Sequence, residues 1–404
     1  MKRGYVSMSL VWFFCLAALG AFFPFISMYL GENAGLSGTE VGMVLCMVPL
    51  MGVVGQPIWG QIADRTGRRT RVLLVVILGA ALGYTCLYFT SGVLPLMLVI
   101  GATAFFWTSV LPSSLAVTLG LVRDASRPAF GLIRVWGTIG FGLMVFAFPS
   151  LVDALESWRG LEASDAVSEP GLGLMFPLVT GLLLVAAVIA YKLPQTAALS
   201  VRAPRGDWRR LLRHGPFVRL LLFCFCAYLC LRGPMAFFAL FVRSHGGSAE
   251  LVSQMWMLML VLEVPLIAFS GATLARFGAR GLLAMGVIAG GLRWTVCAVA
   301  PDLSWIFPVQ ILHGIVIAGL MIGAPLYVEA VVPERLRAIG QGMLAMIGTS
   351  LGGVTSNFGA GWLSENLGAN APYLIGGLGA LTLGCLTPLL LPAPRRAPRA
   401  ADEE

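Results

Sequence analysis

Apolar residues recur along the whole chain in blocks that are separated by short polar segments. Each block is close to the roughly 20 residues that an α-helix needs to cross about 30 Å of hydrocarbon. The pattern predicts twelve membrane-spanning helices, at about 7–30, 40–63, 72–90, 93–122, 130–151, 172–192, 216–241, 251–275, 281–300, 303–330, 336–363 and 371–392. An even number of spans places both ends of the chain on the same side of the membrane.

The charges between the blocks predict which side that is. If the N-terminus is inside, the inner segments carry most of the basic residues, including Lys2, Arg3, Arg123 and Arg127. The outer segments carry Arg159 and Arg243 together with many of the acids. Because cytoplasmic loops are enriched in Lys and Arg, we expect cytoplasmic termini and a location in a bacterial inner membrane.

Composition agrees with a protein that crosses the membrane many times. Of 404 residues, 58% are hydrophobic and 11% are charged, whereas a soluble domain has about 25% charged residues. Soluble, disordered and fibrous classes are therefore excluded. The net charge of +8 would suggest nucleic-acid binding in a soluble protein. Here the basic residues lie between apolar blocks, where they set orientation, so we expect no nucleic-acid partner.

An internal repeat divides the chain into two halves. The sequence G-Q-I-A-D-R-T-G-R-R at 60–69 follows the second span, and a weakened copy, G-A-T-L-A-R-F-G-A-R at 271–280, follows the eighth. Two six-helix halves related in this way are a known transporter plan. We expect an N-terminal bundle at 1–192, a cytoplasmic linker at 193–215, a C-terminal bundle at 216–392 and a cytoplasmic tail at 393–404.

The first copy resembles the signature loop of the major facilitator superfamily, G-x-x-x-D-R-x-G-R-[KR]. The chain matches it at every fixed position: Gly60, Asp64, Arg65, Gly67, Arg68 and Arg69. The resemblance implies an all-α membrane protein of two pseudo-symmetric six-helix bundles, in which this loop gates the inner face. A carboxylate at a helix end can pair with arginines and with helix termini. The simpler interpretation is that the arginines only fix topology.

Five ionisable residues lie inside the predicted spans: Arg134, Arg232, Glu263, Arg293 and His313. Such groups are costly near the bilayer centre, so they usually face a cavity or a partner. At about 1.5 Å per residue, the last four reach the midplane of the C-terminal half, and Arg134 lies nearer the inner end of its span. One interpretation is a salt bridge from Glu263 to Arg293 or Arg232 that pins the bundle. The other is a proton-coupled site, where movement of an arginine or of substrate changes the proton affinity of Glu263.

Further stretches resemble a branch of the superfamily that contains phenylpropionate permeases, with nucleoside and lactose permeases as relatives. They are F-F-P-F (22–25), G-L-I-R-V-W-G-T-I-G-F (131–141), L-E-V-P (262–265), L-R-W (292–294) and Q-I-L-H-G (310–314). In lactose-permease-like symporters, a carboxylate in span eight, an arginine in nine and a histidine in ten couple protons to sugar. The resemblance gives Glu263, Arg293 and His313 these proton-coupling roles. Val316 stands where the sugar symporters have a second carboxylate, which weakens the case for a lactose-type cargo.

The surplus of arginines over carboxylates inside the spans favours an anionic cargo, because guanidinium groups pair well with carboxylates. Aromatic side chains can stack on a ring, although membrane helices also carry them for packing and lipid contact. We expect contacts to substrate from Arg134, Trp136, Arg232, Gln56, Tyr29, Trp256 and Asn357.

The sequence therefore predicts a proton-coupled secondary transporter that imports a small organic solute, an aromatic carboxylate of the phenylpropionate type. The alternatives are a nucleoside or sugar symporter, a proton-driven exporter, and a membrane sensor or assembly protein without transport. The chain has no P-loop, and its three histidines lie in separate regions, so we expect no enzyme activity, no cofactor and no metal. The expected partners are a small-molecule substrate, protons and the lipid bilayer, with a monomeric chain.

Overall fold

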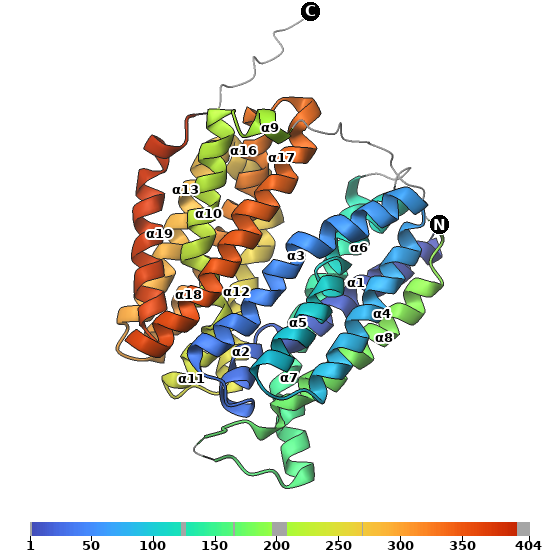
Figure 1. Ribbon diagram of the computed structural model, residues 1–404, viewed down its shortest axis with the longest axis vertical. Coiled ribbons are helices and arrows are strands. Elements are labelled where there is room, and N and C mark those ends of the chain that lie inside the picture. The colour runs from blue at the N-terminus through green and yellow to red at the C-terminus, as the bar shows by residue number, and fades with distance from the viewer. Residues whose placement is uncertain (1, 123–126, 165, 196–207, 269, 394–404) are drawn as a thin grey trace, which may run out of the picture.

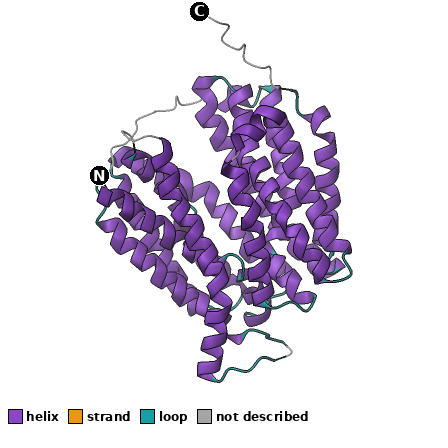
Figure 2. Cartoon of the chain, turned by 180° about the vertical axis from the view of Figure 1, so that it is seen from behind, coloured by secondary structure: helices purple, strands orange, loops and turns teal. Residues whose placement is uncertain are grey.

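The computed structural model describes residues 2–122, 127–164, 166–195, 208–268 and 270–393, which are helical almost throughout and include no strand (Figures 1 and 2). The first six spans are α1–α2–η1 (Lys2–Phe22, Ile26–Met28, Tyr29–Asn33), α3 (Gly38–Thr66), α4 (Arg69–Tyr88), α5–α6 (Val93–Trp107, Val110–Leu121), α7 (Arg127–Arg159) and η2–α8 (Pro170–Leu174, Met175–Tyr191). The short α9 (Trp208–Leu211) precedes the second half.

The last six spans contain several changes of helix type. They are α10–α11 (Gly215–Ala236, Phe238–Ser244), α12 (Ala249–Ala268), α13 (Ser270–Val299), α14–η3–α15–η4–α16 (Leu303–Val309, Gln310–Leu312, His313–Ile317, Ala318–Gly323, Ala324–Val331), η5–α17–η6–α18 (Glu334–Leu336, Arg337–Met343, Leu344–Leu351, Gly352–Leu367) and α19 (Ala371–Leu390). Within the described ranges, ten helices are long and apolar enough to cross a membrane, and the apolar stretch of α12 is shorter. The predicted all-helical membrane fold is confirmed.

One helix is longer than the hydropathy pattern predicts. Helix α7 ends at Arg159 rather than near 151, and its outer end projects from the bundle (Figure 1). Hydropathy marks only the part of a helix that lies in lipid. The following residues Ala154, Leu155 and Glu156 are good helix formers, so the helix continues beyond the apolar segment.

Two glycines give the sequence repeat a structural counterpart. Gly67, just after α3, has φ 67°, and Gly278 has φ 68° and interrupts α13. Both are the eighth residue of their repeat copy. Only glycine adopts this left-handed conformation at little cost. The interruption also means that the ninth span starts after Gly278, close to the predicted residue 281.

The helices form two groups that meet at one end and diverge toward the end where both chain termini lie (Figure 1). In the first group α1 packs on α7 and α8, and α3 on α5; in the second, α13 packs on α19, and α10 on α18. Contacts between the groups join α3 to α18, α7 to α12 and α2 to α11. The exact bounds of the two bundles stay a prediction, and residues 196–207 of the linker and 394–404 of the tail lie outside the described residues.

The closed end is held by backbone contact and by carboxylates. Gly361 of α18 packs so closely on α3 that an added Cβ would lie 2.3 Å from the carbonyl oxygen of Gly38. One turn outward, Glu365 accepts hydrogen bonds from the Thr39 backbone N–H (2.8 Å) and the Ser37 hydroxyl (3.0 Å) at the start of α3. We call these contacts between α3 and α18 the outer seam. An ion pair of 2.8 Å between Arg243 and Glu32 also joins the two groups.

Candidate functional site

Arg293 lies at the centre of the C-terminal helices and is 1% exposed. Its Nε donates to Oε1 of Gln310 at 2.7 Å, and its Nη1 lies 2.9 Å from Nδ1 of His313. The guanidinium lies over the ring of Trp294, with 4.0 Å from Cζ to the ring centroid, a favourable cation–π arrangement. A buried cation is thus held entirely by neutral groups.

These contacts fix the protonation form of His313. A guanidinium has only donors, so Nδ1 of His313 must accept, and the proton of a neutral imidazole then sits on Nε2. Nε2 faces Oε2 of Glu263 at 3.9 Å. The three residues expected to couple protons therefore form one chain, Arg293–His313–Glu263. Glu263 lies against His313, and the salt bridge to Arg293 or Arg232 that was one of the two interpretations does not form among the residues described.

Arg134 faces this chain from the other group of helices. It interacts electrostatically with Glu263, since α7 and α12 run side by side and Ser253 donates to the Val145 carbonyl at 2.8 Å. Its guanidinium lies over the ring of Trp12 at 4.6 Å. The site thus contains cations from both halves.

Arg232 lines two cavities, and the second of them also contains Arg293 and His313. The first, which we call the central cavity, is mainly apolar and aromatic; its lining includes Phe22, Tyr84, Trp107, Arg232 and Asn357. The second contains Tyr228, Arg232, Met235, Arg293, Trp294 and His313. Arg232 has neither an ion pair nor a hydrogen bond to any residue that the structure describes. It is therefore a cation without a partner between an aromatic cavity and the Arg293–His313–Glu263 chain.

Other residues expected to touch substrate lie elsewhere. Trp256 packs on Phe23 and Phe141, with its ring 6.2 Å from that of His313. Tyr29 packs edge-on against Phe176, and neither it nor Gln56 or Trp136 lines the two cavities; Trp136 is 46% exposed. Substrate contact by these residues stays a prediction.

Sequence reasoning gave no role to two residues that the structure places in the site. Gln310 orients Arg293, and its position three residues before His313 on a helix puts both on one face, which could have signalled this. Tyr84 lines the central cavity. Its role could not be recognised from the sequence, because it lies in an apolar run and aromatic residues are common in membrane helices.

The signature loop forms its ion pair internally. Arg69 is 8% exposed and binds Oδ1 of Asp64 through Nη2 at 3.1 Å, across the turn made by Gly67. Arg65 and Arg68 are exposed, and nothing lies within 4 Å of a Cβ added to Gly60. Among the described residues, the loop makes no ion pair with the second bundle, as expected at the end where the bundles diverge. Its gating role stays a prediction.

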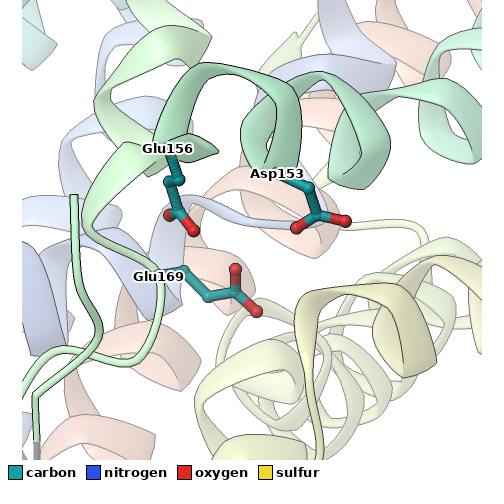
Figure 3. Close-up of side chains that lie close together, drawn as sticks. All are labelled: Asp153, Glu156 and Glu169. Carbon is teal, nitrogen blue, oxygen red and sulfur yellow. The ribbon is translucent and has the colours of Figure 1, made fainter. Parts of the chain in front are cut away.

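A separate acidic cluster lies near the outer end of α7 (Figure 3). Carboxylate oxygens of Asp153, Glu156 and Glu169 lie within 4.8 Å of one another. Glu169 accepts from the Ala249 N–H at 3.3 Å, at the start of α12, and Glu156 accepts from the Gly171 N–H at 2.7 Å. Burial raises the pKa of Glu169, and the neighbouring charges of Glu156 and Asp153 raise it further, against the backbone hydrogen bond that lowers it.

Comparison with known proteins assigns this architecture to a family. The model of the MFS_1 like family matches residues 5–374. The chain belongs to this family. It is a multi-pass membrane transporter of the major facilitator type and not an enzyme.

Relatives and solved structures agree with this assignment. The maltose permease of Geobacillus stearothermophilus is 28% identical over 398 residues, which cover 98% of this chain and 95% of the permease. The probable 3-phenylpropionic acid transporter of Escherichia coli K12 is 26% identical over 313 residues, 76% of this chain and 77% of that protein. The crystal structure of the nucleoside transporter NupG has a TM-score of 0.82 at 17% identity, and the match covers 96% of this chain and 99% of NupG.

Proposed function

We propose that this transporter is a proton-coupled symporter that imports a small aromatic carboxylate by alternating access. The observation that carries the proposal is the chain Arg293–His313–Glu263, with contacts of 2.9 and 3.9 Å, beside a cavity that Arg232 also lines. We also propose that both termini are cytoplasmic in a bacterial inner membrane. The diverging end of the bundles is then the inner one.

The chain offers a way to link cargo and proton. While Arg293 donates to Nδ1, His313 cannot take up a second proton, because no lone pair is free. A cargo carboxylate that pairs with Arg232, which lines both cavities, brings its negative charge beside the second cavity and there competes with His313 for Arg293, since guanidinium–carboxylate pairs are strong. Release of Nδ1 lets His313 accept a proton at that nitrogen, and the Glu263 carboxylate, which faces Nε2, stabilises the imidazolium that forms. Cargo and proton then favour each other's binding.

The lining of the central cavity supports an aromatic carboxylate as cargo. Phe22, Tyr84 and Trp107 offer faces and edges for ring contact. Arg232 supplies an unpaired guanidinium for the carboxylate. A ring and an anion thus both find chemically matched groups in one cavity.

The likeness to maltose permease favours a second candidate, a sugar symporter. A disaccharide carries many hydroxyl groups, each of which needs a hydrogen-bond partner when it leaves water. The side chains of the central cavity that carry a polar group are few: Tyr84, Thr103, Trp107, Arg232 and Asn357. Thr103 already donates to the Val99 carbonyl at 2.7 Å. The lining therefore favours an aromatic acid over a disaccharide.

The test is uptake of labelled 3-phenylpropionate into proteoliposomes under an imposed pH gradient. We expect accumulation that follows the gradient, loss of that accumulation in Glu263→Gln, and retained exchange of cargo in that variant, since exchange needs no net proton movement. Glu250→Gln is the matched control, because Glu250 is an exposed residue of the same helix that contacts Gln254.

Each contrary result selects an alternative. Cargo accumulation that occurs only when the pH gradient is reversed would indicate an exporter. Uptake of maltose or a nucleoside but of no acid would indicate those symporters, and no flux of any compound would indicate a sensor or assembly protein. Full accumulation by Glu263→Gln would remove Glu263 from the proton path.

A further inference from the structure

The central cavity contains a hydroxyl group with no partner. Tyr84 on α4 is 3% exposed and lines the cavity. Its ring is fixed by edge contacts to Phe22 (centroids 4.9 Å apart) and Trp107 (6.1 Å). Its hydroxyl nevertheless forms no hydrogen bond with any residue in the described part of the chain. Buried hydroxyl groups nearly always have a partner, so this one calls for a ligand or a solvent molecule.

A second polar atom of the same cavity lacks a partner. Asn357 on α18 is 5% exposed and donates through Nδ2 to the Leu45 carbonyl at 3.1 Å. A carbonyl can only accept, so this bond fixes which end of the amide carries the nitrogen. Oδ1 is buried and accepts from no group. Tyr84 and Asn357 belong to different bundles, so the two unpartnered groups approach the cavity from both sides.

We propose that the cargo is a hydroxylated aromatic acid and that Tyr84 is the residue that selects for its ring hydroxyl. This inference rests on the proposed function and narrows its substrate class. The ring hydroxyl accepts from or donates to the Tyr84 hydroxyl, and a hydroxyl that reaches the α18 side donates to Oδ1 of Asn357. The carboxylate pairs with Arg232, which lines the same cavity.

The physical reason is the cost of an unpaired polar group. An analogue without the hydroxyl offers no partner to the Tyr84 hydroxyl or to the buried Oδ1 of Asn357, whereas the hydroxylated acid satisfies at least one of them. Sites that are built to hydrogen-bond a hydroxyl discriminate strongly against analogues that lack it. Purely apolar contact with the ring, by contrast, would treat the two acids alike.

The experiment is calorimetric titration of the purified, full-length transporter with three acids. They are 3-phenylpropionate and its derivatives with a hydroxyl at ring position 3 or 4. For the unchanged protein we expect one hydroxylated acid to bind about tenfold more tightly than 3-phenylpropionate, the gain from about one net hydrogen bond. Tyr84→Phe should remove this preference, so that the three acids bind with similar affinity.

Matched controls separate the hydroxyl from the fold. Tyr84→Phe keeps the ring and its contacts, so it should fold as the unchanged protein does. Tyr88→Phe, one turn further on α4 and 46% exposed, should keep the preference. Asn357→Leu should reduce the preference, and Asn366→Leu, the same change at the exposed outer end of α18, should not.

The outcomes distinguish failure of the preference for a hydroxylated acid from failure of the proposed transport of aromatic acids. Equal affinities for all three acids, or a preference that persists in Tyr84→Phe, would overturn this inference and leave the proposed transport of aromatic acids intact. Binding of none of the acids, together with binding of maltose or a nucleoside, would defeat the proposed cargo and this inference with it.

Discussion

At the outer seam, the addition of a single methyl group should change the equilibrium between transporter conformations. In Gly361→Ala the new Cβ would lie 2.3 Å from the Gly38 carbonyl oxygen and 3.0 Å from the Gly42 Cα. These are backbone atoms, so no side chain can rotate away. Ordinary contact begins at 3.4 Å, so α3 and α18 must separate by about 1 Å, because packed interiors have no spare room.

The cost follows from the packing. Overpacking by a methyl group costs about 1–3 kcal/mol, a change of roughly 5- to 150-fold in an equilibrium constant. Because α3 and α18 belong to different bundles, the clash disappears when the bundles part at this end. We therefore expect Gly361→Ala to shift the population toward a state that is open there.

Distance measurement by electron spin resonance checks this shift. Spin labels on Ser91→Cys and Leu367→Cys report on the two bundles at the closed end, in a background where the exposed Cys86 and Cys385 are replaced. We expect a longer-distance population to grow in Gly361→Ala. Gly359→Ala is the control, because a Cβ there meets nothing within 4 Å. Identical distance distributions for the two variants would refute the reasoning.

Two further changes test the electrostatics and the site. Glu169→Gln should raise the melting temperature at pH 7 but not near pH 4. Burial, together with the charges of Glu156 and Asp153, raises the pKa of Glu169 in the folded state. The protonated side chain therefore contributes stability at low pH, and this contribution is lost as the pH rises through that pKa. Melting curves across that range that run parallel for both proteins would contradict this. Gln310→Leu removes the acceptor 2.7 Å from Nε of Arg293, so thermal unfolding should show a loss of about 1.5–3 kcal/mol, the usual worth of a hydrogen bond to a charged group. An unchanged melting temperature would show that Gln310 does not hold Arg293.

The hydropathy pattern was sufficient to predict the all-helical membrane fold. The spans could be predicted because each apolar block has the length that the bilayer imposes, and the all-helical membrane fold is confirmed. The end of α7 could not, because past the membrane the helix depends on local propensity. The repeat was visible as sequence, and Gly67 and Gly278 show that the same backbone turn lies behind both copies.

The sequence predicted that the residues expected to couple protons lie together in the candidate site, but not which of them contact each other. Spacing and resemblance brought Glu263, Arg293 and His313 together, yet only the rotation of the helices decides that Glu263 faces His313 rather than a guanidinium. Tyr84 was out of reach for a related reason. A hydroxyl becomes informative only when its surroundings are known to leave it unpaired, and no sequence pattern carries that information.

The glycine contacts of the outer seam also bear on how readily the two bundles separate and rejoin. Gly38, Gly42 and Gly361 have no rotamers, so bringing these surfaces together immobilises no side chain at the point of closest approach and costs no side-chain entropy there. The fit of one backbone against another permits one alignment, which Glu365 then fixes by binding the first turn of α3. Repeated opening and closing therefore returns the bundles to the same register without any search among side-chain conformations.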